Sequence, residues 1–198
     1  MIDNKNGIDL VMQLIRDGMV VKNDLLHKLQ SEESLTTPEK VRDEMELWYK
    51  NMGIETLTGK PFRLNLPYFT EEEIKAVEDN DEVLLCLPGG IDAAILGKMF
   101  HMECWAFHDP LVTRKTEHAD FWFSTKKSLQ PDFLDRTPRE ISKRYKDEEK
   151  LNMSMERYMV FLARMKYLTG EYPEKDCKVW MPNTKYEGKS IVIAGIDS

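Results

Sequence analysis

Residues 82–94 read EVLLCLPGGIDAA, and this stretch decides most of what the sequence predicts about the fold. Residues 82–87 form a continuous apolar run, which is typical of a strand buried on both faces. Pro88, Gly89 and Gly90 end this strand, and the apolar spacing that follows predicts a helix over residues 91–101. A second strand is expected at residues 103–107, which completes a strand, helix, strand unit with a right-handed crossover if its strands are parallel.

Further strands are expected on both sides of this unit. Residues 62–66 alternate apolar and polar side chains, as in a short half-buried strand, and residues 120–124 carry an aromatic cluster. Strand alternation places Trp122 on the face opposite Phe121 and Phe123, and core packing is the favoured role for one of these sets. In the tail, two strands joined by a turn are expected at residues 178–181 and 190–196.

The helices are predicted from capping residues and apolar spacing. Thr37 and Pro38 start a helix that ends near Gly53, since its apolar positions recur every three or four residues. A capping box at residues 70–73 starts a short helix to about residue 79, and a longer helix covers residues 154–168. Other helices are expected at residues 7–17 and 23–30 and after the capping signal at residues 137–140.

These elements predict an α+β fold dominated by helices. The amino-terminal part is helical, and helices pack on a small central sheet of about four or five strands. We expect one globular domain over residues 1–198, with a weak division between a helical segment, 1–55, and an α/β core, 56–198. Because the strand-like run at 190–196 lies so close to the last residue, the chain is also interpreted as a possible amino-terminal part of a longer protein.

Composition excludes several classes of function. The formal net charge is −7, with no dense basic stripe, so nucleic-acid binding is not expected. No apolar run is long enough for a membrane span, and the amino terminus lacks the pattern of a secretory signal. The three cysteines, Cys86, Cys104 and Cys177, are widely spaced and do not indicate a disulfide framework. A cytoplasmic protein without membrane contact is therefore predicted.

The strongest candidate for a ligand site is the turn formed by Gly89, Gly90 and Asp92. Glycines between a strand and a helix allow a ligand to approach backbone N–H groups at the positive end of the helix, which suits a phosphate or a carboxylate. In this hypothesis a basic residue such as Lys98 or Arg114 lies nearby. The structural alternative, which we favour, is that the two glycines turn the chain and Asp92 caps the following helix.

The same segment, Leu87–Ala94, resembles the serine-glycine-glycine-x-aspartate-serine loop of the PP-loop ATP pyrophosphatases. That resemblance implies a nucleotide phosphate at the turn. Pro88 stands where the first serine of the loop would be and Ala93 where the last would be, so both phosphate-binding hydroxyls are missing. The match covers only this short loop, and no family is assigned from it.

Metal and catalytic groups are weaker candidates. His101, Cys104 and His108, with His118 further on, are ligand types that zinc accepts, but their spacing is not a zinc signature, and no metal is expected. No nucleophile elbow, Walker loop or metalloprotease motif occurs, so catalytic residues and cofactors stay unknown. Acid and base groups would be available if the loop over residues 108–120 folded over the glycine turn: Asp92, Asp109, Glu117, His118 and Asp120.

Two functions remain open from the sequence. The favoured one is a non-catalytic interaction or binding module that meets a protein partner or a second copy of itself. The alternative is an enzyme or binding domain that holds an anionic or nucleotide-like small molecule at the glycine turn. The first predicts an exposed apolar surface, and the second predicts a concave site with N–H groups available to the ligand.

Overall fold

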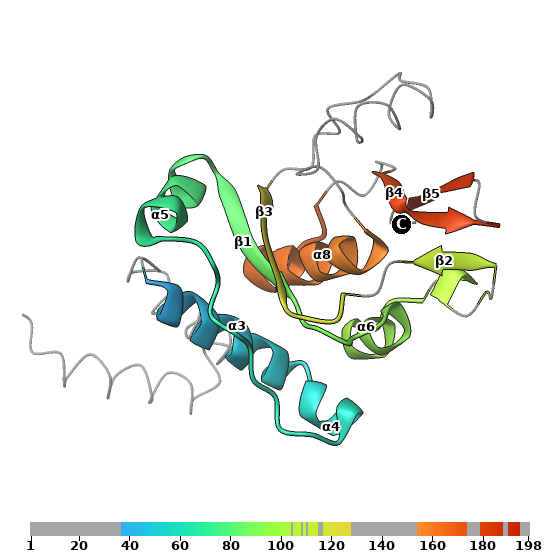
Figure 1. Cartoon of the computed structure of the whole chain (residues 1–198), viewed down its shortest axis with the longest axis horizontal. Helices are drawn as coiled ribbons and strands as arrows, with labels where there is room; N and C mark the ends of the chain where they lie inside the picture. Colours follow the sequence, from blue (N-terminus) through green and yellow to red (C-terminus); the bar gives the residue numbers. More distant parts are fainter. Residues whose placement is uncertain are drawn as a thin grey trace, which may run out of the picture. The chain divides into compact units, whose positions relative to one another are not determined.

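The computed structural model shows helices α3, α4, α5, α6 and α8, the 3₁₀ helix η1 and strands β1 to β5 (Figure 1). All described residues belong to one unit of the chain, Thr36–Ser198. The helices expected at 7–17 and 23–30 and the capping signal at 137–140 lie outside the described residues. The expected division after residue 55 stays a prediction. The residues described are 37–103, 105–107, 109, 111–114, 117–127, 154–173, 179–187 and 190–194.

Helix α3, Pro38–Asn51, begins as predicted. The Thr37 hydroxyl oxygen accepts a hydrogen bond from the Lys40 N–H at 3.3 Å, and Pro38 occupies the first turn. The predicted apolar face is buried at Val41, Met45 and Trp48. The following helix, α4, Ile54–Thr58, begins directly after Gly53, which has a φ of 88°.

Helix α5, Glu71–Asp79, starts with the predicted capping box. The Glu73 N–H donates to the Thr70 hydroxyl at 3.2 Å, and the Thr70 N–H donates to the Glu73 carboxylate at 2.9 Å. The strand predicted at 62–66 is wrong, because this segment is extended without pairing to another strand. Its Leu64 and Asn65 N–H groups donate to side-chain carboxylates instead.

Strand β1, Glu82–Leu87, has the predicted bounds and pairs antiparallel with β3, Phe121–Lys126. Cys86 lies opposite Trp122 in this pairing. Only the second half of β1 is buried, and residues 82–84 are half-buried, so burial along the whole strand was wrong. The buried half is the one that Tyr49 of α3 reaches, since its hydroxyl donates to the Cys86 carbonyl oxygen.

The expected strand, helix, strand unit is not formed. Helix α6, Ala93–Phe100, follows β1, but Trp105–Phe107 is a 3₁₀ helix, η1, rather than a strand. A Cβ built on Gly97 would lie 2.7 Å from the Phe107 ring, so η1 packs closely against α6 at this glycine. The chain therefore turns back onto α6, and β1 pairs with β3 in the antiparallel direction.

A second sheet has the strand order β2-β4-β5, with both pairings antiparallel. Its strands are β2, Val112–Arg114, β4, Val179–Tyr186, and β5, Ser190–Ala194. The tail hairpin is thus present, with β4 longer than predicted. The mixed α+β fold is confirmed. A single central sheet of four or five strands is not confirmed, because the strands described here are divided between two sheets.

Helix α8, Met155–Thr169, is the longer helix predicted from the sequence. The Ser154 hydroxyl accepts from the Arg157 N–H at 3.2 Å, and Gly170 ends the helix in the left-handed conformation. Arg157 lies over the Phe121 ring, 3.6 Å from its centroid, so α8 covers the phenylalanine side of β3. Trp122, on the alternate face, is buried.

The contact between α3 and α8 contains a buried arginine. Arg164 is only 3% exposed and forms an ion pair with Glu44 of α3. Its guanidinium lies 5.3 Å from the ring centroids of both Trp48 and Tyr167. Burial lowers the pKa of Arg164 to about 10. Within the described part of the chain, no helix is long and apolar enough to cross a membrane.

Candidate functional site

The glycine turn connects β1 to α6 as the sequence predicts. Gly90 has a φ of 73°, a conformation that favours glycine. Asp92 precedes α6, and its carboxylate accepts a hydrogen bond from the Ile95 N–H at 2.8 Å. Asp92 is therefore the N-cap of α6, in agreement with the structural alternative.

The N–H groups of this turn bind other parts of the same chain. The Gly89 N–H donates to the Asp120 carboxylate at 2.9 Å, and the Gly90 N–H donates to the Glu117 carbonyl oxygen at 2.8 Å. The second Asp120 oxygen accepts from the Asn65 N–H at 2.7 Å. One carboxylate thus joins the turn to the segment before α5.

Close packing accompanies these hydrogen bonds. A Cβ built on Gly89 would lie 2.8 Å from the Cα and carbonyl carbon of Ala119 and from the His118 carbonyl oxygen. Only glycine fits here, because backbone atoms cannot move aside as a flexible side chain can. The residues 117–120 therefore fold over the glycine turn, where the sequence hypothesis placed this loop.

An ion pair fixes the start of that loop. The Arg157 guanidinium of α8 donates to the Glu117 carboxylate at 2.9 Å, and both side chains are largely buried. Burial lowers the pKa of Arg157, while the charge of Glu117 acts in the opposite direction. The loop is thus held at one end by α8 and at the other by Asp120.

The other candidate acid and base groups are not brought to the turn by any contact described here. Asp109 accepts a hydrogen bond from the Leu111 N–H at 2.9 Å, which makes it part of a local turn. His118 is exposed. The basic partners expected near the turn were Lys98, which is exposed on α6, and Arg114, which belongs to β2.

The zinc candidate is only partly described. His101 ends α6 in the left-handed conformation and is exposed. Cys104 and His108 lie outside the described residues. Where the structure is described, no group of three or more histidine, cysteine, aspartate or glutamate side chains could hold a metal ion.

The Cys86 thiol is buried beside the turn. Burial, and then the charge of Asp120, raise the pKa of this thiol well above its usual range. A nucleophilic cysteine requires the opposite shift, because the thiolate is the reactive form. Cys86 therefore acts as a core residue.

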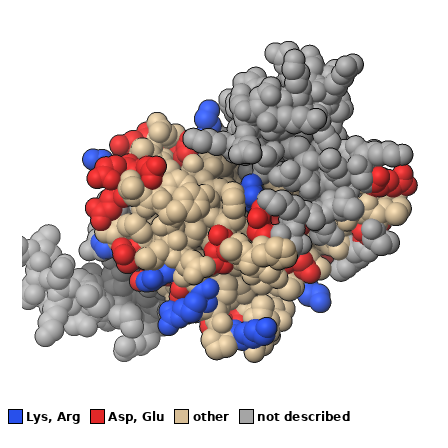
Figure 2. All heavy atoms as spheres, in the orientation of Figure 1, with Lys and Arg blue, Asp and Glu red and all other residues tan. Residues whose placement is uncertain are grey.

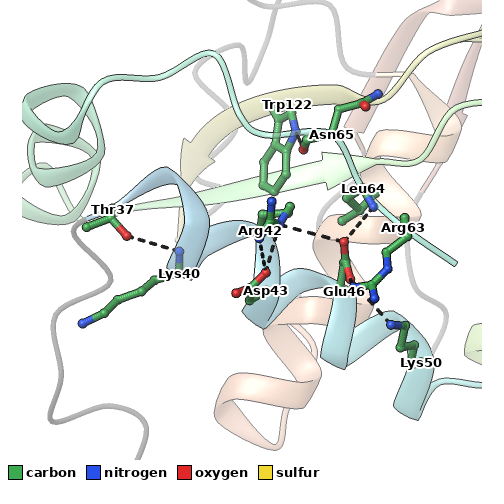
Figure 3. Close-up of polar contacts among 10 residues, drawn as sticks. All are labelled: Thr37, Lys40, Arg42, Asp43, Glu46, Lys50, Arg63, Leu64, Asn65 and Trp122. Carbon is green, nitrogen blue, oxygen red and sulfur yellow. Dashed lines mark hydrogen bonds and ion pairs between the residues drawn. The ribbon is translucent and has the colours of Figure 1, made fainter.

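A charged cluster centred on Glu46 holds the extended segment against α3 (Figure 3). Glu46 is only 4% exposed, and its carboxylate accepts from the Leu64 N–H and the Arg63 guanidinium, both at 3.0 Å. Lys50 adds an ion pair at 3.5 Å. Burial acts to raise the pKa of Glu46, but these hydrogen bonds and charges outweigh burial and lower it below the ordinary value of 4.5.

We expect Glu46→Gln to lower the free energy of unfolding by about 1 kcal/mol at pH 7, because hydrogen bonds to a charged group are stronger than those to a neutral one. A lowered folded-state pKa contributes stability above pH 4.5, and this contribution is lost as the pH falls through the folded-state pKa. Urea unfolding of both proteins at pH 7 and about pH 3 measures the difference. A difference that does not shrink at acid pH would contradict the assignment.

Two tyrosine hydroxyls reveal a feature of the β1–β3 sheet that the sequence did not predict. The Tyr49 hydroxyl donates to the Cys86 carbonyl oxygen at 2.6 Å, and the Tyr68 hydroxyl donates to the Trp122 carbonyl oxygen. The Lys127 N–H donates to the Asp81 carbonyl oxygen at 3.0 Å, so the hydrogen-bonded pairs alternate from there and Cys86 with Trp122 is a non-hydrogen-bonded pair. The carbonyls of such a pair point away from each other, toward the two outer edges. At the Cys86–Trp122 pair, therefore, each outer edge of the sheet is capped by a tyrosine hydroxyl.

The same alternation fixes the direction of the remaining backbone groups. The pairs Leu84 with Ser124 and Glu82 with Lys126 lie two and four residues further along, so their N–H and C=O groups also point outward. Among the described residues, these outward groups bind no tyrosine or other partner. As far as the described residues go, the far half of the sheet therefore has open edges. The sequence gives no signal for the tyrosine caps, because Tyr49 and Tyr68 lie far along the chain from the strand residues that they bind.

Comparisons with protein-family models, with curated proteins and with solved structures find no match for this chain. The site must therefore be interpreted from its own geometry.

Proposed function

We propose that the protein is a non-catalytic interaction module of a soluble, cytoplasmic protein, with a protein partner and no nucleic-acid or membrane ligand. The observation that carries this proposal is the pair of edges on the β1–β3 sheet that no other described segment pairs with. Backbone N–H and C=O groups at an edge can pair with another extended chain, and interaction domains use this mode of binding. The net charge of −7 favours a protein partner over a polyanion.

The glycine turn supports the same proposal. Its Gly89 and Gly90 N–H groups bind the chain's own Asp120 and Glu117, so they contribute to packing. Five large apolar side chains are also exposed among the described residues. They are Leu47, Leu57, Leu66, Tyr68 and Leu111.

A second candidate is an anionic or nucleotide-like small molecule bound at Gly89, Gly90 and Asp92. The observation that favours it is the Asp120 carboxylate itself, because its oxygen lies 2.9 Å from the Gly89 nitrogen. The turn can thus bind an anion. A ligand there would have to replace Asp120, and that assignment stays a prediction.

Native mass spectrometry of the purified protein distinguishes the two candidates. We expect the interaction module to show the bare mass of the chain at a defined oligomeric state. A retained small molecule that disappears in Gly90→Val would support the ligand site and contradict the module. Gly53→Val is the matched control, because Gly53 has a similar positive φ of 88° and open space around it, like Gly90.

A further inference from the structure

The outer edge of β3 presents the N–H and C=O groups of Ser124 and Lys126. Ser124 is half-buried and Lys126 is exposed. Phe123 and Thr125 alternate with them on the other face and are half-buried. A strand laid along this edge would therefore find backbone partners, one cation and one partly exposed aromatic ring.

We propose that this edge, at Ser124 and Lys126, binds an extended acidic and apolar segment of a partner protein by strand addition. The inference rests on the proposed function and names its surface and the chemistry of its partner. The added strand would form hydrogen bonds with the outward backbone groups and place a carboxylate near Lys126.

The strand that already pairs with β3 indicates what the partner should contain. On the inner edge, Glu82 of β1 lies opposite Lys126, and Asp81 forms an ion pair with Lys127 at 3.3 Å. The apolar residues of β1 then follow. Lys126 has a neighbouring position on each side of β3, one on β1 and one on an added strand. An acidic residue of the added strand at that position would face the positive charge of Lys126, as Glu82 does on β1.

The outer edge of β1 is less suited to such a partner. Helix α5 contacts β1 and carries exposed acidic residues, which Figure 2 shows gathered in red over this helix. An acidic strand would be repelled there, and a second copy added through its own β3 would bring like charge to Lys126. These acidic residues are Glu71, Glu72, Glu73, Glu78 and Asp79.

Tyr68 limits how far the added strand can extend. Tyr68 is 68% exposed, and its hydroxyl donates a hydrogen bond to the Trp122 carbonyl oxygen, which lies on the same edge of β3. The partner can therefore pair with the residues from Ser124 onward but not with Trp122. The accepted segment is short, and its affinity depends strongly on the few hydrogen bonds available.

The test uses a fluorescent peptide with the sequence of residues 80–87 and alanine at the position of Cys86. Its affinity for the full chain is measured by fluorescence anisotropy. We expect Ser124→Pro, which removes one outward N–H and blocks the edge, to weaken binding about tenfold or more. Lys126→Glu should weaken it by a similar factor. It places like charge opposite Glu82, but Lys126 is exposed, so solvent screens the repulsion and the chain stays folded.

Two controls make the result specific. Lys60→Glu changes the charge by the same amount at an exposed residue in the turn after α4, and it should leave binding unchanged. A second peptide with lysine at the positions of Asp81 and Glu82 should bind about tenfold more weakly than the acidic one. Circular dichroism checks that each variant is folded.

Other outcomes overturn the inference. The proposed acidic partner strand is rejected if the peptide does not bind the wild-type chain, or if Ser124→Pro and Lys126→Glu bind it as tightly as the control Lys60→Glu. A dimer that Ser124→Pro abolishes assigns the edge to a second copy instead. A partner protein retained from lysate by both wild-type and Ser124→Pro also rejects this edge but leaves the proposed function standing. A monomer at all concentrations that retains no partner contradicts the proposed function itself.

Discussion

Glu44→Ala is expected to lower the free energy of unfolding by about 3 kcal/mol, because it removes the carboxylate partner of a buried guanidinium. Arg164 is only 3% exposed, and among the described residues its Nε and Nη1 atoms have no hydrogen-bond partner. The guanidinium of Arg164 forms its ion pair with the Glu44 carboxylate through the third nitrogen, Nη2. Urea unfolding followed by circular dichroism measures the change.

A second substitution separates the lost charge from lost packing. The double variant Glu44→Leu with Arg164→Met replaces the pair by apolar side chains, which often leaves stability unchanged or higher. We expect it to recover most of the loss. If the double variant were as unstable as Glu44→Ala, the unpaired charge would not be the cause.

Gly89→Ala should cost about 2 to 3 kcal/mol, since the added methyl group would overlap backbone atoms. Its Cβ would lie 2.8 Å from Ala119 atoms, and relieving this contact would move residues 117–120 away from the turn. The Gly89 hydrogen bond to Asp120 would then be strained. Thermal and urea unfolding of the purified variant test this expectation.

Gly90→Ala is the matched control in the neighbouring position. Nothing lies within 4 Å of a Cβ built on Gly90, so the only cost is its positive φ of 73°. That cost is about 1 kcal/mol. Equal losses at the two glycines would show that backbone conformation, rather than contact with Ala119, decides the stability of the turn.

The sequence predicted the local elements well. Thr37, Thr70 and Ser154 are N-caps, and their position before apolar periodic runs is a signal contained within a few residues. Strand β1 was predicted with the correct bounds for the same reason. Capping and periodicity depend on near neighbours, which a single sequence displays.

Strand pairing was predicted less well, because it depends on distant residues. The segment 103–107 fits a strand by its apolar and aromatic residues, but Phe107 packs on Gly97 and residues 105–107 form η1. Residues 62–66 alternate like a strand, but the Glu46 carboxylate takes the Leu64 N–H. In both cases a tertiary contact overrides the local pattern.

At the candidate site, the sequence located the glycine turn and the capping role of Asp92. It also placed Asp120 in a loop that could reach the turn. It did not predict that the Asp120 carboxylate binds the Gly89 N–H, or that tyrosines cap the sheet edges. Such contacts join residues far apart in the chain, and no spacing rule encodes them.

The Asp120 carboxylate also has a mechanical consequence. It binds the N–H groups of both Asn65 and Gly89, so the chain between these residues, with α5 and β1, forms a loop that begins and ends at one side chain. A force that pulls residues 65 and 89 apart acts first on these two hydrogen bonds and on the one that the Trp122 indole N–H donates to the Asn65 carbonyl oxygen at 3.1 Å, before α5 or β1 carries any load.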